Sequence, residues 1–478
     1  MDRASGVLMH ITSLPGSYSS GGFSFEEAKH FIDFLADSGF SWWQVLPFGP
    51  VDMFHSPYTP VSAFGGNPYF VDPEVLFSEG LISEASLARQ RQKSPYLCEY
   101  GRLERERIAL LAEAAENCRD REKVRAFLEE NPRLEEFCAF MALKDKNGGL
   151  PWTEWKEKRP DEERLFLWEF IQYVFFRQWE KILAYAHSRG VKVIGDVPFY
   201  MALDSADVRS HPEQFRLSDG IRPEAVAGVP PDYFAKDGQL WGNPLYNWTA
   251  MEQDGFSWWR SRMRQMFRLF DGVRLDHFRG MESYWAVPYG AKTAREGRWE
   301  KGPGMHLTDA IRQEAGEKLV IAEDLGEITP EVVKLRECSG FPGMRVFQFA
   351  FLSHDGPHMP HRYMENCVAY TGTHDNNTLL GYLWETVPSL RSEIMRYCGY
   401  DGDDWDHQGC AAIVRTLLES AAGLVMFPIQ DLLSYGSDTR LNRPGTTEGN
   451  WAYRVTREQI DSLDRSRLRS LNALYRRI

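Results

Sequence analysis

The sequence lacks the features that mark several broad classes of protein. Only 55 of its 478 residues are Lys or Arg, against 68 Asp or Glu, which gives a formal net charge of −13. Nucleic-acid binding needs clustered positive charge, so we expect no nucleic-acid partner. The seven cysteines are scattered without a CxxC pair. We therefore expect neither a disulfide framework nor a zinc site, and a reducing cytoplasm suits the chain best.

Signals for secretion or membrane insertion are also missing. The start, MDRASGVLMH, has neither the charged segment nor the apolar segment of a signal peptide. The most apolar stretch, residues 421–433, is too short to cross a bilayer and contains Gln430 and Asp431. We therefore expect no membrane partner.

What the sequence does contain is a set of eight short apolar runs, each ending in polar or charged residues. Nearly continuous apolar runs are typical of strands buried on both faces, as in a parallel sheet. Helical patterns fill several of the gaps, among them residues 24–39 and 161–190, and the one at 161–190 has an aromatic stripe that we expect to be core. Strands alternating with helices predict a (β/α)8 TIM barrel, with its active site at the C-terminal ends of the strands. The runs cover residues 6–16, 42–50, 191–200, 272–280, 319–326, 343–351, 367–377 and 423–433.

The uneven spacing of these runs predicts large insertions into the barrel. Residues 1–50 and 166–478 are expected to form the catalytic barrel. Residues 51–165 begin as a loop rich in Pro, Gly and aromatic residues and continue as charged helical sequence, so they predict a loop and helical insertion subdomain. Residues 201–265, rich in Pro, Gly, Trp and Tyr, predict a second insertion that covers the cleft.

Carboxylates end four of the predicted strands: Asp196 in IGDVPF, Asp276 in RLDHF, Glu323 in AEDLG and Asp375 in GTHDNN. One such group could simply cap the following helix. Four on different strand ends favour a shared cleft. Because successive strand residues face opposite sides, Arg274 shares a face with Asp276 and would favour its ionised form.

Acidic groups in a cleft suggest two kinds of chemistry. Metal binding could recruit His277 and His374 with the carboxylates, but no HxH or HExxH spacing supports it. Glycosidic-bond chemistry uses one carboxylate as nucleophile and a second as proton donor, ~5–5.5 Å apart in retaining enzymes. Adjacent strands lie ~4.8 Å apart, and Asp276 and Glu323 end the fourth and fifth strands, so they suit this pair. Glu323 would then need a less polar setting that keeps it protonated.

Longer motifs extend over nearly the whole chain. They are ITSLPG (11–16), SPYTPVSAFGGNPYF (56–70), GDVPFY (195–200), GVPPDYF (228–234), GQLWGNPLYNW (238–248), GVRLDHFRG (272–280), IAEDLGEITPEV (321–332), GMRVFQFAF (343–351), YTGTHDNNT (370–378) and NRPGTTEGNWAYR (442–454). With these motifs the chain resembles the 4-α-glucanotransferases, the amylomaltases or disproportionating enzymes of glycoside hydrolase family 77 in the α-amylase clan. Each motif alone is weak, but together they are highly specific.

The resemblance implies roles for individual residues. Asp276 would be the nucleophile, Glu323 the general acid/base, and Asp375 a third carboxylate that holds sugar hydroxyls and favours ring distortion. It also implies a barrel without the C-terminal β-domain of α-amylases, and catalysis without a metal or cofactor. Six residues would bind substrate, in the donor subsite or on a loop overhanging the cleft: Tyr58, Asp196, Tyr233, Trp241, Arg274 and His374.

The expected activity is transfer of a segment of an α-1,4-glucan to the 4-position of an acceptor glucan or glucose, with maltooligosaccharides as substrates. An α-glucan hydrolase of the same clan would use the same residues with water as acceptor, and the sequence separates the two poorly. A metal-dependent barrel hydrolase would be sensitive to chelators. A non-catalytic glycan-binding protein would not need a nucleophile and proton donor.

Overall fold

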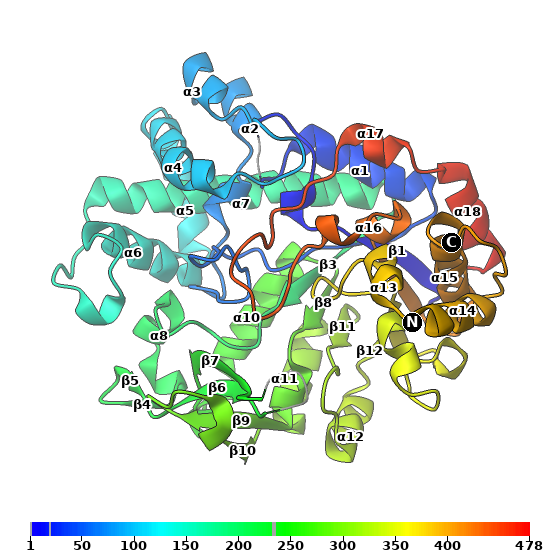
Figure 1. Ribbon diagram of the computed structural model, residues 1–478. Helices are drawn as coiled ribbons and strands as arrows, with labels where there is room; N and C mark the ends of the chain where they lie inside the picture. Colours follow the sequence, from blue (N-terminus) through cyan, green and yellow to red (C-terminus); the bar gives the residue numbers. More distant parts are fainter. Residues whose placement is uncertain (1, 19–20, 232–235) are drawn as a thin grey trace.

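In residues 2–18, 21–231 and 236–478, which the computed structural model describes, eight parallel strands close into a barrel (Figure 1). The strands are β1 (Ala4–Leu8), β2 (Trp42–Gln44), β3 (Lys192–Val197), β8 (Gly272–Leu275), β11 (Leu319–Ala322), β12 (Gly343–Val346), β13 (Cys367–Tyr370) and β14 (Leu424–Pro428). Each predicted apolar run supplies or overlaps one strand. The strands follow one another around the barrel in chain order, and β14 pairs with β1 to close it. The predicted TIM barrel is confirmed.

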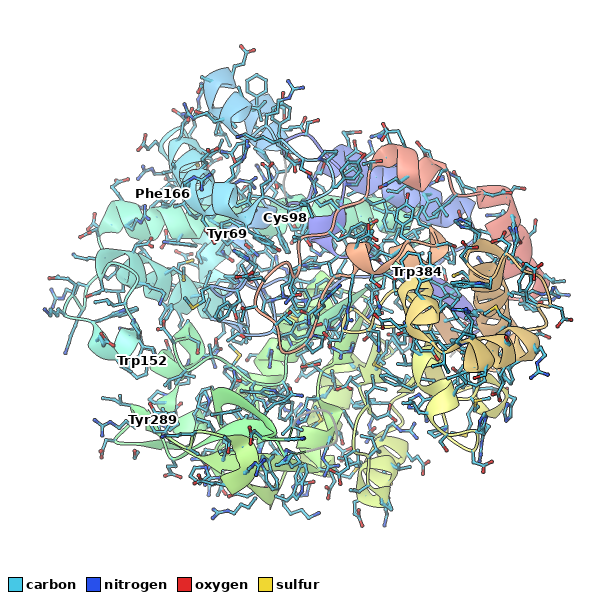
Figure 2. All side chains as sticks on the ribbon, in the orientation of Figure 1. Tyr69, Cys98, Trp152, Phe166, Tyr289 and Trp384 are labelled. Atoms are coloured by element: carbon cyan, nitrogen blue, oxygen red, sulfur yellow. The ribbon has the colours of Figure 1, made fainter. Side chains whose placement is uncertain are left out.

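Apolar side chains fill the interior of the barrel, so it is a packed core and not a channel. Figure 2 draws the side chains over the whole fold. On β8, Val273 and Leu275 join the large apolar core between strands and helices. Arg274, between them, points the other way and meets Asp196 of β3. The apolar residues buried inside the barrel are Ala4, Leu8, Ile194, Ile321, Met344, Val368, Tyr370, Leu424 and Met426.

Helices surround the barrel and pack their apolar faces on the strands. The helical patterns at 24–39 and 161–190 form α1 and α7, and the aromatic stripe of α7 is buried, with Trp168, Phe175 and Trp179 at most 3% exposed. After β12 the chain forms instead a 3₁₀ helix (Phe347–Leu352). The helices along the barrel are α1 (Phe25–Asp37), α7 (Glu162–Ser188), α10 (Ser257–Leu269), α11 (Met305–Ala315), α12 (Pro330–Ser339), α13 (Leu379–Glu385), α14 (Pro388–Tyr397), α15 (His407–Glu419), α16 (Ile429–Leu432), α17 (Arg457–Asp461) and α18 (Arg465–Leu474).

A helical layer lies between β2 and β3 in the sequence and packs on α7, at the upper left of Figure 1. Arg107 of this layer is fully buried and donates to the backbone oxygens of Tyr69 and Val71, which ties α4 to the loop after β2. The helices are α2 (Pro73–Ser78), α3 (Glu84–Arg89), α4 (Tyr100–Glu116), α5 (Arg121–Glu129) and α6 (Pro132–Lys146).

A four-stranded antiparallel sheet lies beside the barrel, at the lower left of Figure 1. Its strand order is β10-β9-β6-β7, from β6 (Ala225–Val229), β7 (Gln239–Pro244), β9 (Ser283–Pro288) and β10 (Arg298–Lys301). Close by in the chain are α8 (Ala206–Ser210), α9 (Trp248–Gln253) and the short pair β4 (Leu217–Ser218) and β5 (Arg222–Pro223).

This sheet joins two segments that sequence analysis treated separately. The predicted insertion 201–265 supplies β6 and β7, but it ends inside the barrel helix α10. Strands β9 and β10 come from the loop after β8, and Val226 of β6 pairs with Val287 of β9. Local patterns do not reveal pairing across some 60 residues of chain, so these strands were missed. The division into a barrel and two insertions remains a proposal.

Two further observations concern membrane-spanning helices and disulfide bonds. No helix in the described parts combines the length and the apolar character needed to cross a membrane. All seven cysteines lie in those parts, and none of them forms a disulfide bond there.

Candidate active site

The four predicted carboxylates all lie at the C-terminal ends of barrel strands. Asp196 is the fifth residue of β3, Asp276 follows β8 directly, Glu323 follows β11 directly, and Asp375 stands in the loop after β13. The fold therefore brings them to one face of the barrel, as the sequence predicts.

Asp276 and Glu323 leave the barrel side by side. Leu275 of β8 pairs with Ala322 of β11, and the Glu323 backbone N donates to the Leu275 oxygen at 3.1 Å. The next hydrogen bond runs from the Phe278 N to the Glu323 oxygen, also at 3.1 Å. The two carboxylates thus start from neighbouring strands, whose spacing is ~4.8 Å.

Arg274 connects two of the carboxylates. Its Nη1 donates to Asp196 Oδ1 at 2.9 Å and Oδ2 at 2.8 Å, and its Nη2 lies 3.0 Å from Asp276 Oδ1. The Arg274 side chain is 5% exposed, Asp196 is fully buried, and Asp276 is 28% exposed. Although burial opposes the charge, Asp196 and Asp276 hold the pKa of Arg274 well above its ordinary value. Arg274 therefore anchors Asp276 on its buried side and leaves it open to the cleft.

Tyr58 and His374 continue this connected set. The Tyr58 hydroxyl donates to Asp196 Oδ2 at 2.8 Å, and its ring stacks on the His374 ring at 5.0 Å between centroids and 13° between planes. His374 Nε2 in turn lies 3.3 Å from Asp375 Oδ2. With Arg274, Asp196 and Asp276, six of the predicted residues thus form one chain of contacts, which runs from Asp276 after β8 to Asp375 in the loop after β13.

Asp375 has partners that were not predicted individually. Asn442 Nδ2 donates to its Oδ1 at 2.6 Å, and Arg440 Nη2 donates to its backbone oxygen at 2.6 Å. Burial alone would raise the pKa of Asp375, but His374 and Asn442 lower it below its ordinary value. Asn442 begins the NRPGTTEGNWAYR motif, which was the available signal in the sequence.

Glu323 has the less polar setting that its predicted role needs. Its Oε2 accepts from the His277 backbone N at 2.8 Å and its Oε1 from the Leu325 backbone N at 3.1 Å. Burial first, and then the charge of Asp276, raise the pKa of Glu323 to about 8, against the opposing effects of Arg274 and the His277 N–H. Near neutral pH Glu323 is therefore mostly protonated and can donate its proton.

The backbone at His277 contributes to this geometry. His277 has φ 48° and ψ 49°, a left-handed conformation that costs a non-glycine residue on the order of 1 kcal/mol. The turn comes directly after Asp276 and orients the His277 backbone N–H, which donates a hydrogen bond to the Glu323 carboxyl group. Burial lowers the pKa of the His277 ring to about 4, so the ring is neutral at pH 7.

Trp241 lies close to this turn, on the exposed part of β7. Its ring centroid is 4.9 Å from that of His277 and 6.2 Å from that of Tyr200, and 38% of the residue is exposed. The structure thus places Trp241 beside the turn that follows Asp276. Tyr233 lies outside the described residues.

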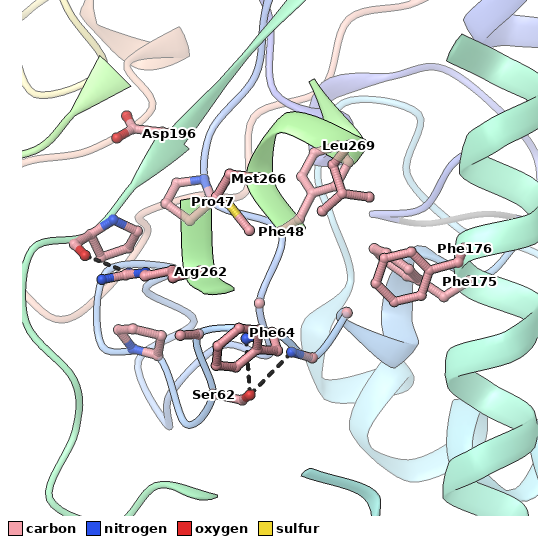
Figure 3. A pocket seen from close by; sticks show the side chains of 16 residues that line it. Pro47, Phe48, Ser62, Phe64, Phe175, Phe176, Asp196, Arg262, Met266 and Leu269 are labelled. Carbon is pink, nitrogen blue, oxygen red and sulfur yellow. Dashed lines mark hydrogen bonds between the residues drawn. The ribbon is translucent and has the colours of Figure 1, made fainter. Parts of the chain in front are cut away.

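Of the four strand-end carboxylates, Asp196 alone lines one small cavity. It measures about 30 Å³, and Asp196 borders it on one side (Figure 3). Phe48, Phe64 and Arg262, each at most 5% exposed, form other parts of its lining. This volume holds one or two water molecules and no sugar ring. In the described parts of the chain, no group of three His, Cys, Asp or Glu residues is placed to hold a metal ion.

Comparisons with known proteins show which family the chain is similar to. A family model described as 4-alpha-glucanotransferase matches residues 9–460. The chain is 42% identical to a 4-alpha-glucanotransferase of Thermus thermophilus, with 98% of each chain covered, and 40% identical to one of Streptococcus pneumoniae, with 100% of this chain and 98% of the other covered. A solved structure, amylomaltase from Streptococcus agalactiae in complex with acarbose, aligns over 100% of both chains with a TM-score of 0.94 and 34% identity.

Proposed function

The chain belongs to this family of 4-alpha-glucanotransferases, glycoside hydrolase family 77, and from that premise we propose how its residues act. It transfers a segment of an α-1,4-glucan to the 4-position of an acceptor glucan or glucose, by a retaining double displacement. The observation that carries the proposal is the pair on adjacent strand ends: Asp276 anchored by Arg274, and Glu323 with a pKa of about 8.

In the first step Asp276 attacks the anomeric carbon of the donor sugar. The bond from that carbon to the glycosidic oxygen breaks, and Glu323 gives its proton to the leaving oxygen. In the second step the ionised Glu323 takes the proton of the acceptor 4-hydroxyl, whose oxygen displaces Asp276 from the sugar. Both residues return to their starting states, and two inversions leave the α-configuration retained.

The residues around this pair form the donor subsite. Arg274 and Asp196 are buried and bound to each other, so they hold Asp276 rigidly. Tyr58 and His374 present stacked rings beside Asp196 and Asp375. Asp375 binds hydroxyl groups of the donor sugar most tightly when the ring is distorted towards the transition state.

The choice between a sugar and water as acceptor depends on shielding of the intermediate. The Trp241 ring lies nearly perpendicular to the His277 ring, next to Asp276, and stays partly exposed, so that it can meet an incoming sugar. An apolar ring at this point disfavours water and binds a flat sugar face. The substrates are α-glucan oligosaccharides, maltooligosaccharides above all. The absence of nucleic-acid and membrane partners and a location in the cytoplasm remain predictions from the composition.

Incubation with maltotriose tests the proposal. A ladder of longer glucans together with glucose supports transfer, whereas glucose and maltose alone would identify a hydrolase. The same incubation with a chelator such as EDTA should give an unchanged ladder. Loss of activity with the chelator, restored by a divalent cation, would overturn the metal-free mechanism.

A further inference from the structure

The loop that carries His374 and Asp375 is tied at both ends to one buried side chain. This 371–378 loop connects β13 to α13. Asp431 Oδ2 accepts from the Thr371 hydroxyl at 2.5 Å, at the start of the loop. Asp431 Oδ1 accepts from the Leu379 backbone N at 2.7 Å, directly after the loop. A single carboxyl group therefore sets the distance between the two ends.

Asp431 occupies an unusual environment for an acid. It lies on α16, just after β14, and is 2% exposed. Burial raises its pKa to about 7, and the hydrogen bonds from Thr371 and Leu379 oppose that rise without the help of a cation. An acid placed among apolar neighbours costs stability unless its hydrogen bonds are made. Burial of the Asp431 carboxyl group is unfavourable by itself, and its structural effect is to make the two hydrogen bonds to the loop.

The loop is mostly buried, but a small void lies on one side of it. A cavity of about 20 Å³ lies between α16 and the loop, and its lining includes Thr373, His374, Asp431 and Arg440. Close-packed surfaces hold a segment by contact, but a void leaves it room to shift. Arg440 and Asn442 reach Asp375 from a separate loop. Hydrogen bonds therefore fix the position of Asp375 together with the burial of the loop and the stacking of His374 on Tyr58.

We propose that Asp431 is a positioning residue: by binding both ends of the 371–378 loop it places His374 and Asp375 against the donor sugar. The inference rests on the role proposed above for Asp375. Because Asp375 acts on the distorted ring, displacement of the loop weakens transition-state binding more than binding of the undistorted donor. Loss of Asp431 therefore lowers kcat much more than it changes KM.

The test compares two substitutions of Asp431 with maltotriose as the donor. Asp431→Ala removes both acceptors, and kcat should fall at least about 30-fold while KM stays within about threefold. Asp431→Asn keeps the shape and an oxygen for the Leu379 N–H, and the Thr371 hydroxyl can turn to accept from the amide. It should restore kcat to within about fivefold of the parent.

Asp72 offers a matched control, far from the loop in the chain. It is also 2% exposed and also accepts two hydrogen bonds, in its case from the backbone N–H groups of Phe25 and Glu74, both at 2.8 Å. Asp72→Ala should lower the melting temperature as Asp431→Ala does, yet leave kcat within about twofold. All kinetics are measured at least 15 °C below the lowest melting temperature. Thr371→Val, alone and combined with Asp431→Ala, completes a double-mutant cycle in kcat, which should be strongly non-additive.

Three results would overturn the inference: Asp431→Ala with kcat within threefold of the parent, a rise in KM without a fall in kcat, or additive effects in the cycle. Asp375→Asn separates this inference from the proposed function. If Asp375→Asn is inactive while Asp431→Ala behaves like Asp72→Ala, only the positioning role is lost. If Asp375→Asn keeps parental activity, the role of Asp375 and the inference resting on it both fail.

Discussion

Replacing Glu323 with Gln removes the proposed proton donor with little change of shape. The amide oxygen can still accept from one of the backbone N–H groups of His277 and Leu325. The other N–H loses its acceptor, at a cost of about 1 kcal/mol. The variant should therefore fold, and its kinetics should report on the proton.

The size of the effect follows from the environment of Glu323. With its pKa raised to about 8, about 90% of the enzyme holds the proton at pH 7. With its ordinary pKa of 4.5, about 0.3% would hold it. The site thus makes about 300-fold more of the active acid available. General acid catalysis contributes 10²–10⁴-fold, so kcat/KM for maltotriose should fall by about that factor in Glu323→Gln.

The assay compares two donors. Fluoride needs little protonation to leave, so Glu323→Gln should form the intermediate from α-maltosyl fluoride within about tenfold of the parental rate. The amide cannot accept a proton from the acceptor, so the maltosyl-enzyme should accumulate and be visible as an increase in intact protein mass. Azide, which needs no base, should restore turnover. Equal losses on both donors would refute the assignment.

The pH dependence gives an independent check. In the parent, kcat/KM for maltotriose should fall above pH 8, as Glu323 loses its proton. Folding disfavours the ionised form of Glu323, because it raises the pKa of this group from 4.5 to about 8. The contribution of Glu323 to the free energy of unfolding is therefore full below pH 4.5 and is lost as the pH rises towards 8. The melting temperature of Glu323→Gln should therefore fall less than that of the parent between pH 5 and 8. A basic limb near pH 8 that persists in the variant with the fluoride donor would contradict the reasoning.

Three further predictions concern the nucleophile, the stereochemistry and the acceptor. Asp276→Asn should lose at least about a thousandfold in kcat with a nearly unchanged melting temperature, and activity within tenfold of the parent would exclude it as nucleophile. Products observed by NMR as they form should be α-configured, and fresh β-anomers would exclude double displacement. Trp241→Ala should raise free glucose release relative to chain-length redistribution. An unchanged ratio with a lower melting temperature would mean that the ring only packs.

Much of the fold could be predicted from the sequence because short stretches of residues show the pattern that each barrel strand requires. Each barrel strand is a short apolar run that ends in polar residues, and burial on both faces of a parallel sheet requires that pattern. The placement of Asp276 and Glu323 on neighbouring strand ends follows from their positions in the polar ends of the fourth and fifth runs. Right-handed crossovers allow one order around the barrel, so sequence order became spatial order.

The tertiary structure alone decided how these groups behave. The sequence predicts that Glu323 ends a strand. The pKa of Glu323, however, depends on burial, on the charge of Asp276 and on the His277 turn. The sheet beside the barrel and the Asn442 contact with Asp375 join segments distant in the chain. Local residue patterns cannot register such contacts, because burial and hydrogen bonding are properties of the assembled fold. Asp431 illustrates the difference: in the sequence it only interrupts an apolar run, and in the fold its carboxyl group meets both ends of the loop that carries Asp375.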